Sequence, residues 1–240
     1  MNIGAVLDVG CGPGIDTKIN AKKHMNASFY GVDIGSNIPA ISVRDYEIPN
    51  LHYLRGDALN LPLKDQTMNL VVSMGVFHHT SNPKKCIEEA FRVLKQSGCI
   101  CVYLYKNHED NLLKLFGIKI EKIFLWIFSQ LSYKTGKKLC YVLSPFILLF
   151  FSYPGQILKK IPQFKNIGSA FPLYWGTTPA SIIGDLQDRL MSPINHRFSK
   201  RDVENLLIKC GFTCVEVITT RTGHYGYGKK EPSTYSKRDT

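Results

Sequence analysis

The segment Val6-Leu7-Asp8-Val9-Gly10-Cys11-Gly12-Pro13-Gly14 constrains this chain of 240 residues more than any other. A short apolar run followed by alternating glycines predicts a buried strand that turns sharply into a helix. In an open α/β sheet, such a turn lies at the carboxyl ends of the strands, where ligands bind. Gly10, Gly12 and Gly14 let a ligand lie directly on the backbone. A dinucleotide-binding turn has its third glycine at position 15, and Ile15 stands there, which argues against NAD or FAD.

The first 105 residues alternate short apolar runs with helix-like stretches, which predicts a doubly wound α/β fold. Later in the chain, helices are expected from Thr178-Pro179 and from Ser199, and strands at 212–219 and 225–229. In the first part, strands are predicted at Ala5–Val9, Ser28–Asp33, Leu51–Arg55, Met68–Ser73 and Cys99–Tyr105, and helices at 15–25, 36–46 and 83–95.

Residues 106–175 break this alternation, because they are apolar, aromatic and rich in lysine. They predict two or three helices joined at Pro145, Pro154 and Pro162. The expected organisation is a core at 1–105, a helical insert after the fifth strand at 106–195, a final helix and strands completing the sheet at 196–230, and a disordered tail at 231–240.

Three predicted strands end in or beside a carboxylate, at Asp8, Asp33 and Asp57. Because parallel strands end at one edge of the sheet, we expect these groups around the glycine turn. Asp33 can accept hydrogen bonds from both ribose hydroxyls, and Asp57 can accept one from an adenine amino group. The charge of Asp8 suits a cationic ligand better than a pyrophosphate. A ligand with an adenosine and a positively charged amino-acid end fits the set, and S-adenosylmethionine is such a ligand.

Four segments follow one another in a specific order: VLDVGCGPG (6–14), GVDIG (31–35), GDALNLPLKDQTMNLVVSMGVFHHTSNP (56–83) and EEAFRVLKQSGCICVYLY (88–105). In this order they resemble the class I S-adenosylmethionine-dependent methyltransferases, in the group similar to the ubiquinone/menaquinone-biosynthesis enzymes. The segment FSKRDVENLLIKCGFTCVEV (198–217) matches the usual end of that fold. The resemblance implies a Rossmann-like, mostly parallel sheet of seven strands with one antiparallel strand.

The resemblance also implies which residues hold the methyl donor. The glycine turn surrounds its methionine end, the second strand tip its ribose, the third its adenine, and the end of the fourth strand its methyl group. The implied residues are Asp8, Gly10, Cys11, Gly12 and Gly14 in the turn, Asp33 and Ile34, Asp57 and Ala58, and Ser73 and Met74.

Three histidines are candidates for proton transfer. His78 and His79 follow the fourth strand, where acceptor and methyl group meet, and His196 precedes the last helix. Histidine can take a proton from an acceptor because its pKa lies near neutral pH. The resembled family carries the histidine pair with many substrates, which suits a loop-ordering role instead.

The net charge of +11 is concentrated in the insert, where residues 106–165 hold ten lysines and three acidic residues. Residues 139–158 are uncharged and lie between two lysine pairs. A single membrane crossing there would separate the fifth strand from its partner at 212–219, so a transmembrane helix is not expected. The alternatives left open are a lid over an apolar acceptor pocket, a patch on an anionic membrane, and a dimer interface.

The seven cysteines show no C-x-x-C spacing, and no other metal-binding motif occurs, so no metal site is expected. The N-terminus does not read as a signal peptide, which favours a cytoplasmic protein, peripheral at the membrane if the insert binds lipid. The predicted activity is methyl transfer from S-adenosylmethionine to a small or lipid-like acceptor. The net charge alone suggests a nucleic-acid methyltransferase, but this chain lacks the Asp/Asn-Pro-Pro-aromatic motif expected of one that methylates amino groups. The other alternative is a non-catalytic subunit that binds the donor or acts as a structural partner.

Overall fold

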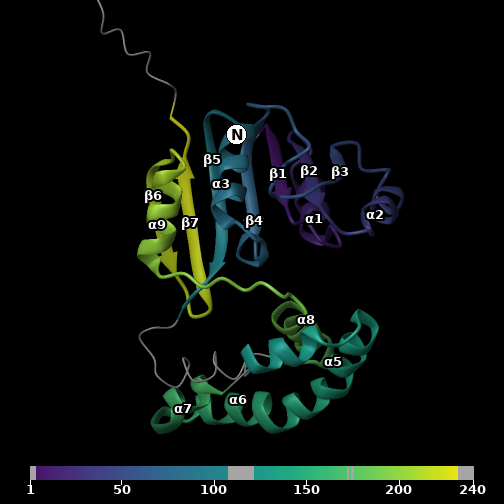
Figure 1. Ribbon diagram of the computed structural model, residues 1–240, viewed down its shortest axis with the longest axis vertical. Helices are drawn as coiled ribbons and strands as arrows, with labels where there is room; N and C mark the ends of the chain where they lie inside the picture. The colour runs from purple at the N-terminus through teal and green to yellow at the C-terminus, as the bar shows by residue number, and fades with distance from the viewer. Residues whose placement is uncertain (1–3, 108–121, 172, 174–175, 232–240) are drawn as a thin grey trace, which may run out of the picture. The chain divides into compact units, whose positions relative to one another are not determined.

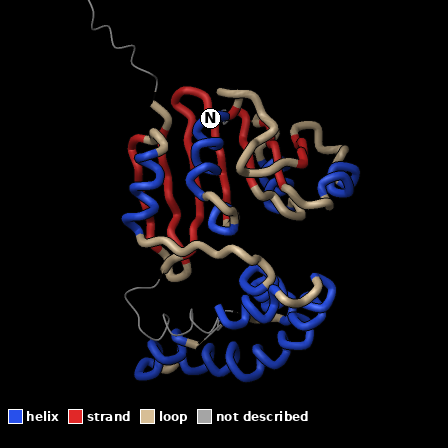
Figure 2. The backbone as a smooth tube through the Cα atoms, viewed as in Figure 1, coloured by secondary structure: helices blue, strands red, loops and turns tan. Residues whose placement is uncertain are grey.

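The computed structural model describes residues 4–107, 122–171, 173 and 176–231. The chain divides into two compact units, as Figure 1 shows. Met1–Lys106 and His196–Thr240 form the first unit, and Asn107–Asn195 form the second. In the described residues the first unit contains the sheet, and the second is helical (Figure 2).

The sheet of the first unit has seven strands in the order β3-β2-β1-β4-β5-β7-β6. Strand β7 runs antiparallel to both of its neighbours, β5 and β6, and the other pairings are parallel. The predicted Rossmann-like α/β fold with seven strands is confirmed, and the sheet is mixed rather than purely parallel. The strands are β1 (Ala5–Val9), β2 (Ser28–Asp33), β3 (Leu51–Arg55), β4 (Met68–Met74), β5 (Leu94–Tyr105), β6 (Thr213–Thr219) and β7 (Gly223–Lys229).

The helices of this unit begin at the capping residues that the sequence indicates. The Asn82 side chain accepts a hydrogen bond from the Lys85 backbone, and Ser199 and Asp202 form a reciprocal capping box. The helices are α1 (Ile15–Lys23), α2 (Ile38–Arg44), the 3₁₀ turn η1 (Phe77–His79), α3 (Pro83–Val93) and α9 (Lys200–Lys209).

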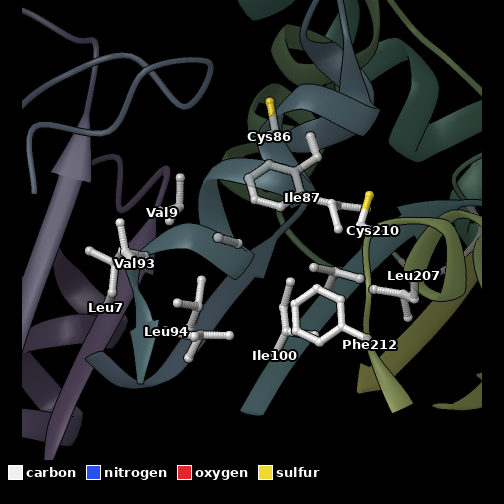
Figure 3. Packing of buried hydrophobic residues seen from close by; sticks show 14 of the residues in the cluster. Leu7, Val9, Cys86, Ile87, Val93, Leu94, Ile100, Leu207, Cys210 and Phe212 are labelled. Atoms are coloured by element: carbon white, nitrogen blue, oxygen red, sulfur yellow. The ribbon is translucent and has the colours of Figure 1, made fainter. Parts of the chain in front are cut away.

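The main core lies between the sheet and helices α3 and α9. Ile87 of α3 and Leu207 of α9 are fully buried together with Ile100 of β5, and Figure 3 shows these side chains converging. A second cluster includes Ala21 of α1 and Phe29 of β2, both buried. Covering the sheet in this way leaves the carboxyl ends of β1 and β2 to the glycine turn and the loops that follow the strands.

The largest difference from the expected strand boundaries is at β5, whereas those of β4, β6 and β7 differ by one or two residues. β5 begins at Leu94 rather than Cys99, because Leu94 pairs with Met68 ahead of an irregularity in the β4–β5 ladder. The turn residue Ser97 lies inside this strand with a positive φ of 62°.

The second unit contains a long helical run in which two of the predicted proline joints are absent. Pro145 lies inside α5, and Pro154 lies in the first turn of α6, with a five-residue π-helix between the two helices. The ring of Pro154 crowds the carbonyl of Phe150, and the wider π turn there accommodates it. Only Pro162 follows a helix end. The elements are helical residues 122–129, then α5 (Tyr133–Ile147), η2 (Leu148–Ser152), α6 (Tyr153–Lys160), η3 (Pro162–Phe164), α7 (Lys165–Ala170) and α8 (Pro179–Leu190).

Candidate functional site

The glycine turn after β1 uses its glycines for two different purposes. Gly10, Gly12 and Gly14 have φ values of 81°, 53° and 71°, a region that side chains disfavour. A β-carbon at Gly10 would clash with the side chain of Val76, so this glycine is required for packing. A β-carbon at Gly12 would meet no atom within 4 Å. The space above Gly12 is therefore open, as close approach of a ligand requires.

The Asp33 carboxylate is held against this turn. Its Oδ2 accepts a hydrogen bond from the Gly12 backbone N–H at 2.9 Å, and its Oδ1 accepts one from the Gly35 N–H at 2.7 Å. The Asn37 side chain donates to the Gly12 carbonyl at 2.8 Å. Each carboxylate oxygen retains further acceptor capacity, so a fixed Asp33 can also accept from a pair of ribose hydroxyls.

Asp8 lies in a partly buried position beside helix α1. The hydroxyl of Thr17 donates to Asp8 Oδ2 at 2.5 Å. Burial raises the pKa of Asp8, and the neighbouring charges of Asp16 and Asp33 raise it further, while the Thr17 hydrogen bond opposes the shift. A cation bound next to this carboxylate would stabilise its charged form, which is the chemistry expected around an amino-acid ammonium or a sulfonium.

Several of the residues predicted to bind the methyl donor line a cavity of about 430 Å³. Asp8, Gly10, Cys11 and Met74 line it, together with Thr17 of α1. Its volume falls in the range typical of small-molecule sites. Burial raises the pKa of the Cys11 thiol to about 12, so this side chain lines the cavity as a neutral group and not as a thiolate nucleophile.

Ser73 and Met74 are both predicted to face the methyl group, but their side chains point in different directions. The Ser73 hydroxyl is buried and donates to the Val9 carbonyl at 3.1 Å, which ties β4 to β1. Adjacent residues of a strand point to opposite faces, so only Met74 reaches the cavity.

The residues predicted at the adenine and ribose lie at the tips of β2 and β3. Asp57 is exposed, and its Oδ1 accepts from the Leu59 N–H at 2.9 Å, so part of its capacity caps the local turn. Ala58 packs against the main core, and Ile34 is 66% exposed. Asp57 and Ile34 are accessible to a ligand, whereas part of the Ala58 side chain is covered by the core.

A polar network behind the glycine turn was not predicted from the sequence. The Tyr53 hydroxyl donates to the Gly14 carbonyl at 2.9 Å and contacts the Asp45 carboxylate. Asp45 is buried and pairs with Lys18 and Arg44, and Arg44 also donates to the Pro13 carbonyl at 3.1 Å. The hydrogen bond from Arg44 holds the pKa of Asp45 well below its usual range. These residues carry no local motif, because only the fold brings β3 and α2 behind the turn.

The three candidate histidines gather beyond the carboxyl ends of β4 and β5. The rings of His78 and Tyr105 lie 3.9 Å apart between centroids, and those of His79 and Tyr105 lie 5.6 Å apart. The His196 backbone N–H donates to the His78 carbonyl at 2.8 Å. Arg197 covers the Tyr105 ring at 5.7 Å. His78 is fully buried, whereas His79 is half-buried and His196 is exposed.

Comparisons with known proteins agree with this arrangement. Residues 7–102 match a family described as a methyltransferase domain. A Mus musculus protein named "Probable tRNA methyltransferase 9B" is 32% identical over 112 residues, which cover 44% of this chain and 23% of that protein. A Mycobacterium ulcerans (strain Agy99) protein named "Phthiotriol/phenolphthiotriol dimycocerosates methyltransferase 1" is 30% identical over 93 residues, covering 39% and 34%. The chain thus spans no more than about a third of the length of these relatives.

Solved structures are similar over most of the chain. A SAM-dependent methyltransferase from Aquifex aeolicus has a TM-score of 0.52 at 16% identity, covering 95% of this chain and 83% of that one. One from Methanosarcina mazei has a TM-score of 0.53 at 18% identity, covering 96% and 94%. At these identities the likeness concerns the fold.

Residues 7–102 thus match a methyltransferase domain and have the fold of solved S-adenosylmethionine-dependent methyltransferases. The methyl donor that this match and this fold indicate is S-adenosylmethionine. The residues present fit that molecule, because the backbone at Gly12 is open, Asp33 is held beside it, and Asp8 is a partly buried carboxylate whose charged form a cation would stabilise.

Proposed function

We propose that the whole chain transfers a methyl group from S-adenosylmethionine to a lipid-like acceptor. Binding of the methyl donor is supported above all by the hydrogen bond from Gly12 to Asp33. The space above Gly12 is open, and both residues lie in the segment that matches a methyltransferase domain. The bound donor supplies an already activated methyl group, so the protein has to align the acceptor and exclude water. In this proposal Asp8 and the glycine turn orient the donor and Met74 faces its methyl group, which is supported by the cavity that Asp8, Gly10 and Met74 line together.

In this proposal, the histidines at 78, 79 and 196 lie next to the methyl acceptor, where one of them can remove its proton. His79 is the better candidate for a base, because its side chain is half-buried, whereas that of His78 is fully buried. The burial of His78 against Tyr105 suits a positioning role. His196 reaches the same cluster through its backbone hydrogen bond to His78 and serves as an exposed alternative to His79.

A lipid-like acceptor is supported by two observations. One is the relative from Mycobacterium ulcerans, whose name describes it as a phthiotriol/phenolphthiotriol dimycocerosates methyltransferase. The other is the helical unit, whose described residues expose many large apolar side chains, Trp126, Phe146 and Phe150 among them. Membership of the ubiquinone/menaquinone-like group, a lid role for residues 106–195, a cytoplasmic location and peripheral contact with an anionic membrane are parts of the same proposal.

A tRNA acceptor is the second candidate, because the mouse relative is named a probable tRNA methyltransferase and the chain carries a net charge of +11. Incubation with isotopically labelled donor and, in parallel, a lipid extract, quinones and total tRNA tests the two candidates. Label in a lipid or quinone fraction, with the mass gain of one methyl group, supports the proposal. Label in tRNA alone overturns it in favour of the second candidate. No donor binding in calorimetry would make the chain a non-catalytic subunit.

A further inference from the structure

The helical run Tyr133–Lys160 has an inverted distribution of side chains. Its buried positions are Gly136, Cys140, Ser144, Leu148, Ser152 and Gly155, and all but Leu148 are small. Between residues 139 and 158 its exposed positions are all apolar, and all but Pro145 are large: Tyr141, Val142, Phe146, Leu149, Phe150, Tyr153 and Ile157. A helix on the surface of a water-soluble domain buries its large apolar residues and exposes polar ones.

Helix α8 of the same unit shows the ordinary distribution and so serves as an internal comparison. It buries Ile182, Leu186 and Leu190 against α5. Its most exposed positions are small, such as Ala180 and Gly184. The inverted distribution is therefore not shared by every helix of the unit.

The inward side of the run is built for close helix contact. A β-carbon at Gly168 of α7 would lie 2.6 Å from the Gly155 carbonyl oxygen, so the two backbones nearly touch. The Ser152 hydroxyl donates to the Leu173 carbonyl at 2.7 Å, and Gln156 donates to the Gly176 carbonyl at 2.7 Å. Small and hydroxyl-bearing residues between helices, with large apolar residues outside, are typical of helices whose outer surroundings are lipid.

The charges on this unit match an anionic surface. Between residues 122 and 184 the sequence has seven lysines and no acidic residue. Lys137 and Lys138 precede the apolar face, and Lys159 and Lys160 follow it. Their side chains are exposed, so they can reach phosphate groups while the aromatic residues between them enter the acyl boundary.

The sheet excludes a single crossing of the membrane by this run. Among the described residues it is the one helix long and apolar enough to span a bilayer by length and composition, at 28 residues. Strand β5 precedes it and β7 follows it, and these strands pair directly from Cys99↔Lys229 to Tyr105↔Gly223. Both ends of the run therefore lead back to one side of a membrane.

We propose that residues 133–160 lie in the plane of an anionic lipid surface, with the face defined by Val142, Phe146, Leu149, Phe150 and Ile157 inserted at the acyl boundary. This deepens the membrane contact in the proposed function, but it does not depend on the identity of the methyl acceptor. The other occupant of an exposed apolar face, a second copy of the chain, is an outcome of the test.

The test is co-sedimentation of the full chain with phosphatidylcholine vesicles that contain or lack phosphatidylglycerol. We expect binding to the anionic vesicles that falls by about tenfold or more at high salt. The variant Phe146→Ser/Phe150→Ser should lose binding by about tenfold or more, because it removes two inserting rings. The matched control Val43→Ser/Tyr46→Ser removes apolar side chains that are 74% and 76% exposed on the other unit, and should bind as the wild type does.

A second pair of variants tests the charges. Lys137→Glu/Lys138→Glu should abolish the preference for anionic vesicles, whereas Lys22→Glu/Lys23→Glu at the end of α1 should retain it. Equal binding to both vesicle types, no binding to either, or wild-type binding by the Phe146→Ser/Phe150→Ser protein would overturn the inference. Retention of the chain on membranes after alkaline carbonate treatment would overturn the in-plane orientation in favour of a spanning segment.

Two further measurements separate this inference from its alternatives. Size-exclusion chromatography without lipid should give the same oligomeric state for wild type and the Phe146→Ser/Phe150→Ser variant; dissociation of an oligomer in the variant would show that a second copy covers this face. Calorimetry should show unchanged affinity for S-adenosylmethionine in all four variants. Vesicle binding without methyl transfer would contradict the proposed activity and leave this inference standing. Methyl transfer without vesicle binding would contradict this inference and the proposed membrane contact, and leave the proposed activity standing.

Discussion

The backbone N–H of Gly12 donates a hydrogen bond of 2.9 Å to the Asp33 carboxylate, which joins the first glycine turn to the tip of the second strand. This contact holds the Asp33 carboxylate, which is expected to bind the ribose, next to the turn on which the methyl donor is expected to lie. Because it joins the ends of two neighbouring strands, it holds the glycine turn and Asp33 side by side.

Replacing Asp33 by Ala should weaken binding of S-adenosylmethionine by about 2 kcal/mol or more, because the ribose hydroxyls lose a charged acceptor. Isothermal titration calorimetry measures this. Glu47→Ala, which removes an exposed carboxylate from the segment after α2, is the control and should bind normally. Unchanged affinity in Asp33→Ala would remove the core of the site assignment.

Gly12→Val and Gly10→Ala should fail for different reasons. Gly12→Val should lose donor binding, because the side chain occupies the open space above the turn, and it should also lower the free energy of unfolding, because a β-branched residue is strained at a φ of 53°. Gly10→Ala should lower the free energy of unfolding, because its β-carbon clashes with Val76. Urea denaturation and calorimetry on both proteins separate the effects. A Gly12→Val protein that binds the donor normally would contradict the placement of the ligand.

Donor affinity should fall on acidification through the raised pKa of Asp8. Because burial raises this pKa above its unfolded value, the folded protein holds the proton to higher pH than the unfolded chain does. Ionisation of Asp8 thus costs stability as pH rises between the two pKa values, and a bound cation offsets that cost. Thr17→Val, which removes the hydrogen bond that lowers this pKa, should move the affinity profile to higher pH. Thr17→Ser keeps a hydroxyl and should leave the profile in place, and identical profiles for all three proteins would argue against Asp8 as the ligand of the cation.

His79→Gln should reduce the rate of methyl transfer by about a hundredfold with little change in donor affinity, if His79 acts as the base. His78→Gln should chiefly lower stability, since His78 is fully buried against Tyr105. Rates under saturating donor, paired with thermal denaturation, distinguish the two roles. Losses below about threefold in both variants would assign the pair to packing of the loop.

Lys230→Met should destabilise the first unit by about 1–3 kcal/mol, because two carbonyls would lose their donor. The buried Lys230 ammonium donates to the Phe91 carbonyl at 2.6 Å and to the Leu94 carbonyl at 2.8 Å, at the end of α3. Urea denaturation measures the loss. Lys229→Met, at a half-buried neighbour, is the matched control and should change stability by a few tenths of a kcal/mol.

Local and periodic signals were sufficient for most elements of the first unit. Strand β1 and the turn after it could be read directly, because a buried strand is a continuous apolar run and the turn requires glycines. The starts of α3 and α9 were readable for a similar reason, since Asn82 and Ser199 cap the residues that immediately follow them. The residues of the candidate donor site were named with them, because the strand tips converge at one edge in any sheet of this kind.

The sequence by itself thus determined the class of fold, the donor-binding turn and the order of the elements, all of which depend on contacts between near neighbours. Only the tertiary structure decided that Tyr53 and Asp45 brace the turn from behind, and that Ser73 faces Val9 while Met74 faces the cavity. It also decided which side of residues 133–160 is buried, because the usual pattern predicts that large apolar residues face inward, and this run buries its small residues instead. Those outcomes depend on which distant elements pack together, and a pattern along the chain does not contain that information.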